Sequence, residues 1–136
     1  MAWPPGEHIE VLVAQAKQLL TDVSVVRHDV SLNRALIDLE GQWFGYRIVV
    51  SEIHRADSSM RYAYYVLGND NQLVHGFDNS PDARAIRQRY KARWKSHIHE
   101  EVPHRHDANR NLVLTPEPMT FEAFVEWITQ NLGETK

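Results

Sequence analysis

Two stretches of the chain carry apolar residues at the spacing of one helical face. From Glu7 to about Leu20 the apolar positions recur at intervals of three and four residues, which predicts an amphipathic helix. A second apolar stripe follows Thr120, a residue type that caps helix N-termini, and stops before Gly133. Because each stripe must be buried against another element, we expect an N-terminal and a C-terminal helix on a common core.

Between these helices the chain is rich in β-branched and aromatic residues, in short runs separated by turn-forming residues. The predicted strands are 23–30, 35–39, 44–54, 62–67 and 72–77. Gly68-Asn69-Asp70-Asn71 joins the last two, and these residue types accept the backbone angles of tight turns. The pattern predicts an α+β fold, a twisted antiparallel sheet of four to five strands with the N- and C-terminal helices packed on one face.

A helical pattern returns from Pro81 to Trp94, where Ala85, Ile86 and Tyr90 can face inward with the tryptophan. The remaining positions are mostly basic and include no acidic residue from 84 to 95, a stretch that we call the basic segment. Its cations are Arg84, Arg87, Arg89, Lys91, Arg93 and Lys95. The basic segment predicts a local positive patch on a chain whose net charge is −3 with histidines neutral.

Composition limits the class of protein. The 136 residues suit a single domain over 1–136, and 43% hydrophobic with 24% charged residues is typical of a globular protein. The absence of cysteine excludes thiolate metal sites and a cysteine nucleophile. No run approaches the roughly 20 apolar residues of a membrane span, and the N-terminus does not resemble a signal peptide. We expect a cytoplasmic protein with no membrane partner, alone or as a small oligomer such as a homodimer.

Four of the eight histidines fall within ten residues, at His97, His99, His104 and His106. Imidazole exchanges protons near neutral pH, so histidines beside cationic side chains suit acid–base cleavage of a phosphodiester. Arginines of the basic segment would bind the phosphate and stabilise the charge that develops on it. Among them, we expect Arg87 or Arg93 to make the phosphate contact.

The histidines also allow two other interpretations. Residues two apart in an extended segment point to one side, so a histidine pair could chelate a divalent metal. The candidate ligands are His97 with His99 or His104 with His106, completed by Asp78, Glu52 or Asp107. Alternatively, the segment is a polar surface loop whose histidines bond locally or stay solvated. His-x-His spacing alone does not decide among these interpretations.

Asp78-Asn79-Ser80-Pro81 follows the last predicted strand. Asn79 has a structural explanation, because Asx turns followed by proline end strands. If the loop folds back, Asp78 would meet the histidine segment, and we expect it to share one concave surface with a histidine pair near Glu52 or Tyr64. Glu52 and Arg61, on neighbouring predicted strands, are also consistent with a cross-strand ion pair.

Several short motifs occur in a fixed order along the chain. They are Val50-Ser51-Glu52, Arg61-Tyr62-Ala63-Tyr64-Tyr65, Leu73-Val74-His75-Gly76-Phe77-Asp78-Asn79-Ser80-Pro81, the histidine-rich segment, and Pro116-Glu117-Pro118-Met119-Thr120 before a helix. This order resembles the TumE family of toxin–antitoxin toxins from about Ala35 to Leu132. The family's Asp-Asn matches Asp78 and Asn79, its strand glutamate Glu52, and its tyrosine strand Tyr62 and Tyr64. Ser80 stands where the family has alanine, and Asp82 and Ala83 stand where it has two histidines.

The resemblance implies a small bacterial or archaeal toxin that arrests growth by acting on RNA and is encoded beside a cognate antitoxin. Its implied chemistry is metal-independent histidine acid–base cleavage that needs no cofactor. The catalytic candidates are His97, His99, His104, His106, Asp78 and Glu52, and the RNA-binding candidates are Arg84, Arg87, Lys91, Arg93, Lys95 and Tyr64. A non-catalytic binding module that uses the basic segment and a metal-dependent hydrolase are the alternatives.

Overall fold

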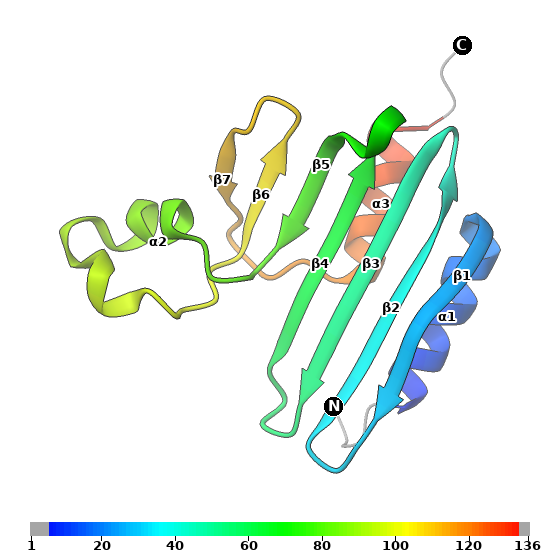
Figure 1. Ribbon diagram of the computed structural model, residues 1–136, viewed down its shortest axis with the longest axis horizontal. Coiled ribbons are helices and arrows are strands. Elements are labelled where there is room, and N and C mark those ends of the chain that lie inside the picture. Colours follow the sequence, from blue (N-terminus) through cyan, green and yellow to red (C-terminus); the bar gives the residue numbers. More distant parts are fainter. Residues whose placement is uncertain (1–5, 134–136) are drawn as a thin grey trace.

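The computed structural model describes residues 6–133, which form one antiparallel sheet with helices (Figure 1). The elements are α1 (Gly6–Leu19), β1 (Thr21–Val30), β2 (Arg34–Trp43), β3 (Tyr46–Arg55), β4 (Met60–Leu67), the 3₁₀ turn η1 (Asn69–Asn71), β5 (Leu73–Asp78), α2 (Ala83–Tyr90), the 3₁₀ segment η2 (Lys91–His97), β6 (His104–Asp107), β7 (Leu112–Leu114) and α3 (Phe121–Asn131). The seven strands lie side by side in chain order. The predicted α+β class is confirmed.

The sheet has seven strands, not the predicted four to five. The two additional strands are β6 and β7, which have four and three residues. Strands this short carry too few alternating positions to reveal a period, and Pro103 directly precedes the first of them. The strand predicted from residue 44 begins at Tyr46 in the structure, two residues later. Phe44 and Gly45 adopt positive φ in the turn between β2 and β3.

The N- and C-terminal helices pack on the same face of the sheet, as predicted, and we call this the helix face (Figure 1). The strands alternate, so that every second residue of β3, from Ile48 to His54, is buried against the helices. The core joins Ile9, Leu12 and Ala16 of α1, Phe121, Phe124 and Ile128 of α3, and the inward residues of β2 to β5. None of the helices between Gly6 and Gly133 is both long and apolar enough to cross a membrane.

The third helix, α2, lies beside β7 at the end of the sheet and packs on residues of the face opposite to α1 and α3, which we call the open face (Figure 1). It begins at Asp82, whose side chain accepts hydrogen bonds from the backbone N–H groups of the first turn. Its buried residues Ala85 and Ile86 pack in a cluster that includes Leu112 and Leu114 of β7. These two leucines pair directly with His106 and His104 of β6, and paired residues point to the same face. The basic segment therefore sits beside the histidines of β6.

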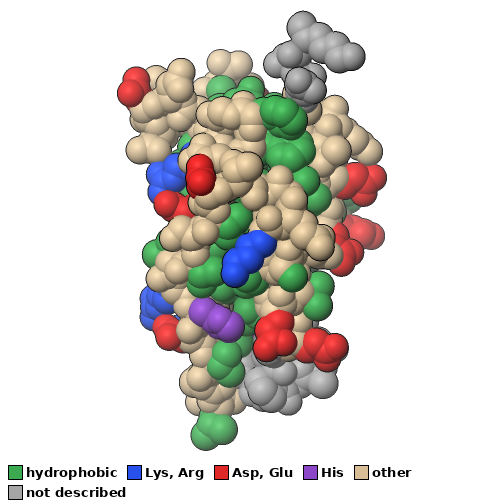
Figure 2. Space-filling view, turned by 90° about the vertical axis from the view of Figure 1, so that its right-hand side faces the viewer, with side chains coloured by type: hydrophobic (Ala, Val, Ile, Leu, Met, Phe, Trp, Pro, Cys, Tyr) green, Lys and Arg blue, Asp and Glu red, His purple; other side chains and the backbone are tan. Residues whose placement is uncertain are grey.

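The other end of the sheet is formed by β1, and within residues 6–133 no strand pairs with its outer side. Val25, Val26 and Val30 of this strand are exposed. Figure 2 shows apolar side chains at the surface on this side of the molecule. The histidine-rich strand β6 lies toward the opposite end of the sheet, with four strands between it and β1.

Candidate active site

Asp78, at the end of β5, is the centre of a polar cluster on the open face. It pairs with His104 of β6, and His106 follows two residues later on the same face. Tyr65 of β4 reaches the same carboxylate and donates a hydrogen bond to it from its hydroxyl group. We call Tyr65, Asp78, His104 and His106 the Asp78 cluster. The prediction that Asp78 meets one pair of the clustered histidines is confirmed for His104 and His106.

The carboxylate of Asp78 is buried, with 3% of the residue exposed. Oδ1 lies 3.0 Å from Nε2 of His104 and accepts the backbone N–H of Ser80 at 2.9 Å. Oδ2 accepts the Tyr65 hydroxyl and lies 3.5 Å from Nε2 of His106. Burial by itself raises the pKa of Asp78, but the hydrogen bonds from His104, Tyr65 and Ser80 bring that pKa below its usual value. Asp78 is therefore ionised at neutral pH.

His104 is the buried partner of Asp78, with 1% of the residue exposed. Its Nδ1 lies 2.6 Å from the carbonyl oxygen of Val102, and its Nε2 faces the carboxylate. Both groups only accept hydrogen bonds, so both ring nitrogens donate and the ring is an imidazolium. Burial lowers the pKa of His104, but the bonds to Asp78 and Val102 outweigh it and raise the pKa overall. His104 holds Asp78 in place and offers no surface to a substrate.

His106 is the accessible histidine of the cluster, with 14% of its side chain exposed. Its Nδ1 lies 3.5 Å from Nη2 of Arg84. A guanidinium only donates hydrogen bonds, so Nδ1 carries the lone pair and Nε2 carries the proton toward Asp78. Burial and the positive charges of His104 and Arg84 lower the pKa of His106. The result is a neutral imidazole whose Nδ1 lone pair accepts a long contact from Arg84 and becomes available as a base when Arg84 binds an anion instead.

Two arginines border the Asp78 cluster. Arg84 is held by a hydrogen bond from its Nη1 to the carbonyl oxygen of Arg110, at 2.8 Å. Arg61 of β4 lies close enough to act on Tyr65. Burial and the hydrogen bond to Asp78 raise the pKa of Tyr65 overall, and the positive charge of Arg61 partly opposes this rise. Within residues 6–133 the Arg61 guanidinium forms no hydrogen bond and no ion pair. These positive charges favour an anion at the cluster.

Gly76 allows Tyr65 to reach Asp78. It pairs with Tyr65 across β4 and β5, and a Cβ atom at this position would collide with the tyrosine ring. The ring therefore lies over the backbone of β5. This close approach is a specific reason for a glycine inside the strand.

Glu52 and Tyr64 are not part of the Asp78 cluster. Both lie on the helix face, 1% and 0% exposed, where the Tyr64 hydroxyl donates to Oε2 of Glu52 at 2.7 Å. The expectation that Asp78 lies near them is not met, because the sheet separates the two faces. Buried Tyr64 offers no ring surface on which an RNA base could stack. The alternative ion pair between Glu52 and Arg61 does not form either, since Glu52 binds His8, His54 and Tyr64.

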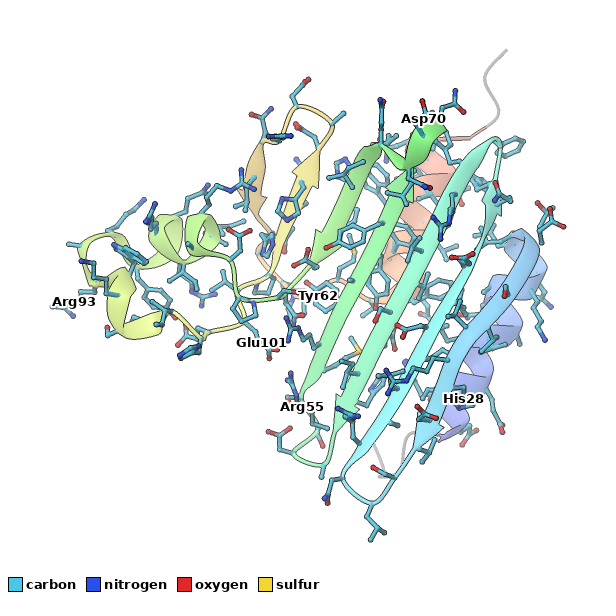
Figure 3. All side chains as sticks on the ribbon, viewed as in Figure 1. His28, Arg55, Tyr62, Asp70, Arg93 and Glu101 are labelled. Atoms are coloured by element: carbon cyan, nitrogen blue, oxygen red, sulfur yellow. The ribbon has the colours of Figure 1, made fainter. Side chains whose placement is uncertain are left out.

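His97 and His99 make no recorded contact with Asp78 among the described residues. The ring of His97 stacks on Tyr90 at a centroid distance of 3.6 Å, and its Nδ1 lies 3.1 Å from Glu100. His99 is exposed. Both lie in the segment between β5 and β6, which we call the excursion. Near its end, Arg55 of β3 donates two hydrogen bonds to Glu101 and so ties the excursion to the sheet. Figure 3 labels both residues.

The predicted RNA-binding cations differ in position. Arg84 faces His106, whereas Arg87 lies over the ring of Trp94 at 4.2 Å from its centroid. Lys91, Arg93 and Lys95 are exposed. In Figure 3, Arg93 lies at the tip of the excursion, far from the sheet. Arg84, which the sequence reasoning did not single out, is therefore the cation placed to act at the cluster.

Sequence reasoning missed Tyr65 and Arg61 at this site, and His8 and His54 at Glu52. The pairing of β4 with β5 could have indicated Tyr65. Asp78 pairs with Ala63, and Tyr65, two residues further along β4, points to the same face. Glu52-x-His54 is likewise a same-face pair on one strand. His8 had no signal, because it is 44 residues from Glu52 and only packing of α1 on the sheet brings the two together.

No known family model matches the chain, and comparisons with curated proteins and with solved structures found no match. The TumE resemblance therefore stays a prediction.

Proposed function

We propose that the chain cleaves RNA at the Asp78 cluster, with His106 as the acid–base catalyst and Arg84 as a phosphate-binding residue. The observation that carries the proposal is the contact between Nδ1 of His106 and the Arg84 guanidinium, at 3.5 Å. It places a proton acceptor next to a group that binds phosphate oxygens. The exposed cations Lys91, Arg93 and Lys95 of the same segment would bind phosphates farther along the RNA, with an affinity that falls as salt rises.

The reaction follows from the hydrogen-bonding roles of these atoms. Arg84 turns from Nδ1 of His106 to the phosphate, and the released Nδ1 takes the proton of a ribose 2′-hydroxyl group while the 2′ oxygen attacks the adjacent phosphorus. Arg84 and Arg61 pair with the non-bridging oxygens and offset their growing charge. The 5′ oxygen leaves with the proton that His106 returns. The products are a 2′,3′-cyclic phosphate and a 5′-hydroxyl end, and no water, metal or cofactor is consumed.

The other residues of the Asp78 cluster position the catalyst. Asp78 faces Nε2 of His106, which keeps the ring in the tautomer with an unprotonated Nδ1 and stabilises the imidazolium that forms. His104 and Tyr65 occupy the remaining positions of the carboxylate. Because His104 is buried, His106 has to serve as both base and acid.

The wider role rests on the TumE resemblance. We propose that RNA cleavage arrests growth and that a cognate antitoxin neutralises it. Expression without the antitoxin should slow growth, and His106→Ala should relieve this effect at an equal level of soluble protein. Growth arrest that persists in His106→Ala would contradict the assignment.

The proposal is tested by incubating purified protein with total RNA, with and without EDTA. Cleavage should be the same in both conditions and fall at least about a hundredfold in His106→Ala, the typical contribution of one acid–base group. His28→Ala, on exposed β1, is the matched control, and the double variant His97→Ala and His99→Ala should also stay active. EDTA-sensitive cleavage would instead indicate a metal enzyme. RNA binding without cleavage in every sample would indicate a binding module.

A further inference from the structure

A second histidine–carboxylate cluster lies on the helix face, where one oxygen of Glu52 accepts hydrogen bonds from two histidine rings. Nε2 of His8 lies 3.0 Å and Nε2 of His54 lies 2.8 Å from Oε1 of Glu52. The three candidate ligand atoms all lie within 4.8 Å of one another. From this convergence we propose that His8, Glu52 and His54 bind one Zn²⁺ ion. This site is separate from the Asp78 cluster and does not depend on the proposed RNA cleavage.

Two of the three ligand distances are close to those of a zinc site, and the two histidine nitrogens, which lie within 4.8 Å of each other, would move closer together around the ion. Zn–N and Zn–O bonds of about 2.0–2.2 Å at tetrahedral angles place ligand atoms about 3.3–3.5 Å apart. The two observed separations from Oε1 are a few tenths of an ångström shorter than this. An ion would therefore replace the two N–H···O hydrogen bonds if the carboxylate oxygen withdraws slightly. Each ring would bind through Nε2 and carry its proton on Nδ1.

The ligand carboxylate is already oriented and ionised. Tyr64 donates its hydroxyl hydrogen bond to Oε2 of Glu52 at 2.7 Å, which leaves Oε1 for the histidines. In metal sites, groups that hydrogen-bond to a ligand in this way fix its orientation. Burial raises the pKa of Glu52, yet the hydrogen bonds from His54, His8 and Tyr64 lower that pKa to about 2. One carboxylate oxygen and two imidazole nitrogens together are a set of ligands that zinc binds in proteins.

The surrounding charge favours a cation at Glu52. The negative charge of Glu122, in the first turn of α3, acts on His8. Among the described residues no lysine or arginine forms an ion pair with Glu52. The Asp78 cluster differs, because the positive charge of Arg84 stands beside His106. Of the two clusters, the one around Glu52 is therefore the better cation site.

The site is also accessible. His8 has 41% of its side chain exposed and borders a cavity of about 220 Å³ between α1 and the start of α3. Leu12, Thr120 and Glu122 also line this cavity. A fourth ligand would come from this side, as water or as the carboxylate of Glu122. The bound ion would join α1 to β3, so it should stabilise the fold as well as bind.

The test uses Zn²⁺ itself, titrated by calorimetry into the full chain carrying His106→Ala, so that the Asp78 cluster loses its accessible ligand. One ion per chain should bind with a dissociation constant in the micromolar range or below, and a saturating concentration should raise Tm. Adding His8→Ala should weaken binding at least about tenfold, since a whole ligand is lost. His8 suits the test because it is partly exposed near the start of a helix. His28→Ala is the matched control and should leave the affinity unchanged.

Two results would overturn the proposal. The first is an equal zinc affinity with and without His8. The second is no binding and no zinc-dependent rise in Tm at about 100 μM, which would mean that the three residues form a hydrogen-bonded network alone. Loss of RNA cleavage in His106→Ala with zinc binding retained would separate the two sites, and zinc affinity would then report on the Glu52 cluster alone.

Discussion

Glu52 of β3 and Asp78 of β5 lie on opposite faces of the same sheet, with β4 between their strands. Glu52 pairs with Tyr62 of β4, whereas Asp78 pairs with the next residue, Ala63, and neighbouring residues of a strand point to opposite faces. Each carboxylate is buried and binds two histidines. Arginines border one cluster, and a glutamate of α3 acts on the other. A single sheet thus holds one histidine–carboxylate cluster bordered by positive charge and another bordered by negative charge.

The Asp78–His104 pair should contribute strongly to stability. His104→Ala leaves a buried carboxylate without its imidazolium partner, and breaking such a pair costs about 3–5 kcal/mol. We predict a loss of about 3 kcal/mol in the free energy of unfolding, measured by urea denaturation. Exposed His99→Ala should change the free energy of unfolding by less than about 0.5 kcal/mol. Similar stabilities of the two variants would show that the pair does not hold the fold.

The same pair should make stability depend on pH. The folded pKa of His104 is raised from 6.5, so its contribution is fully present below the unfolded pKa and is lost as pH rises through the folded pKa. The folded pKa of Asp78 is lowered from 3.8, so its contribution is present above the unfolded pKa and is lost as pH falls through the folded pKa. The difference in unfolding free energy between wild type and His104→Gln should be largest between about pH 4 and 6.5. A difference that stays constant up to pH 9, about 2.5 units above an ordinary histidine pKa, would contradict this account.

Gly76 should be required for the position of Tyr65. In Gly76→Ala the new methyl group meets the tyrosine ring, and overpacking of this kind costs about 1–3 kcal/mol. The cost should disappear in a Tyr65→Ala background, which removes the ring, as a double-mutant cycle of thermal unfolding can show. Gly68→Ala is the matched control, because its Cβ would meet a Val74 methyl group at 3.2 Å. An equal cost of Gly76→Ala in both backgrounds would place the strain elsewhere.

Local patterns predicted the elements whose signals are local. Helical periodicity predicted α1 and α3, and turn residues between alternating runs predicted the hairpin of β4 and β5. A meeting of Asp78 with one of the two histidine pairs was predicted, but the choice of His104 and His106 was not, because the short strand β6 that pairs with β5 was not predicted. The helices and the hairpin were predictable because their signals depend on spacing within a few residues.

The face on which each carboxylate lies was not predictable from these patterns. One residue of register decides whether a side chain points to the helix face or to the open face, and a slip of one position moves Glu52 to the wrong cluster. The contact between His8 and Glu52 depends on how α1 docks on the sheet, which no spacing in the chain records. The strand β7 has three residues and no period of its own. Tertiary packing determines all three features.

Arg84 and Arg93 should have different effects on catalysis. Arg84 faces His106, and Arg93 lies at the tip of the excursion. Arg84→Ala should reduce kcat/KM for RNA cleavage at least about tenfold, because a charged hydrogen bond to the phosphate is lost. Arg93→Ala should leave kcat unchanged and lower the slope of affinity against salt by at most about one phosphate contact. Equal effects on kcat would show that Arg84 has no special position.

The chemical nature of the RNA ends tests the proposed cleavage most directly. A short RNA is digested in EDTA, and the products are analysed by mass spectrometry beside the DNA of the same sequence. If His106 activates the 2′-hydroxyl group, the RNA products carry 2′,3′-cyclic phosphate and 5′-hydroxyl ends, the DNA stays intact, and His106→Ala yields neither product. Ends with a 5′-phosphate and a 3′-hydroxyl, or cleavage of the DNA, would contradict the assignment of His106 as the base at the Asp78 cluster.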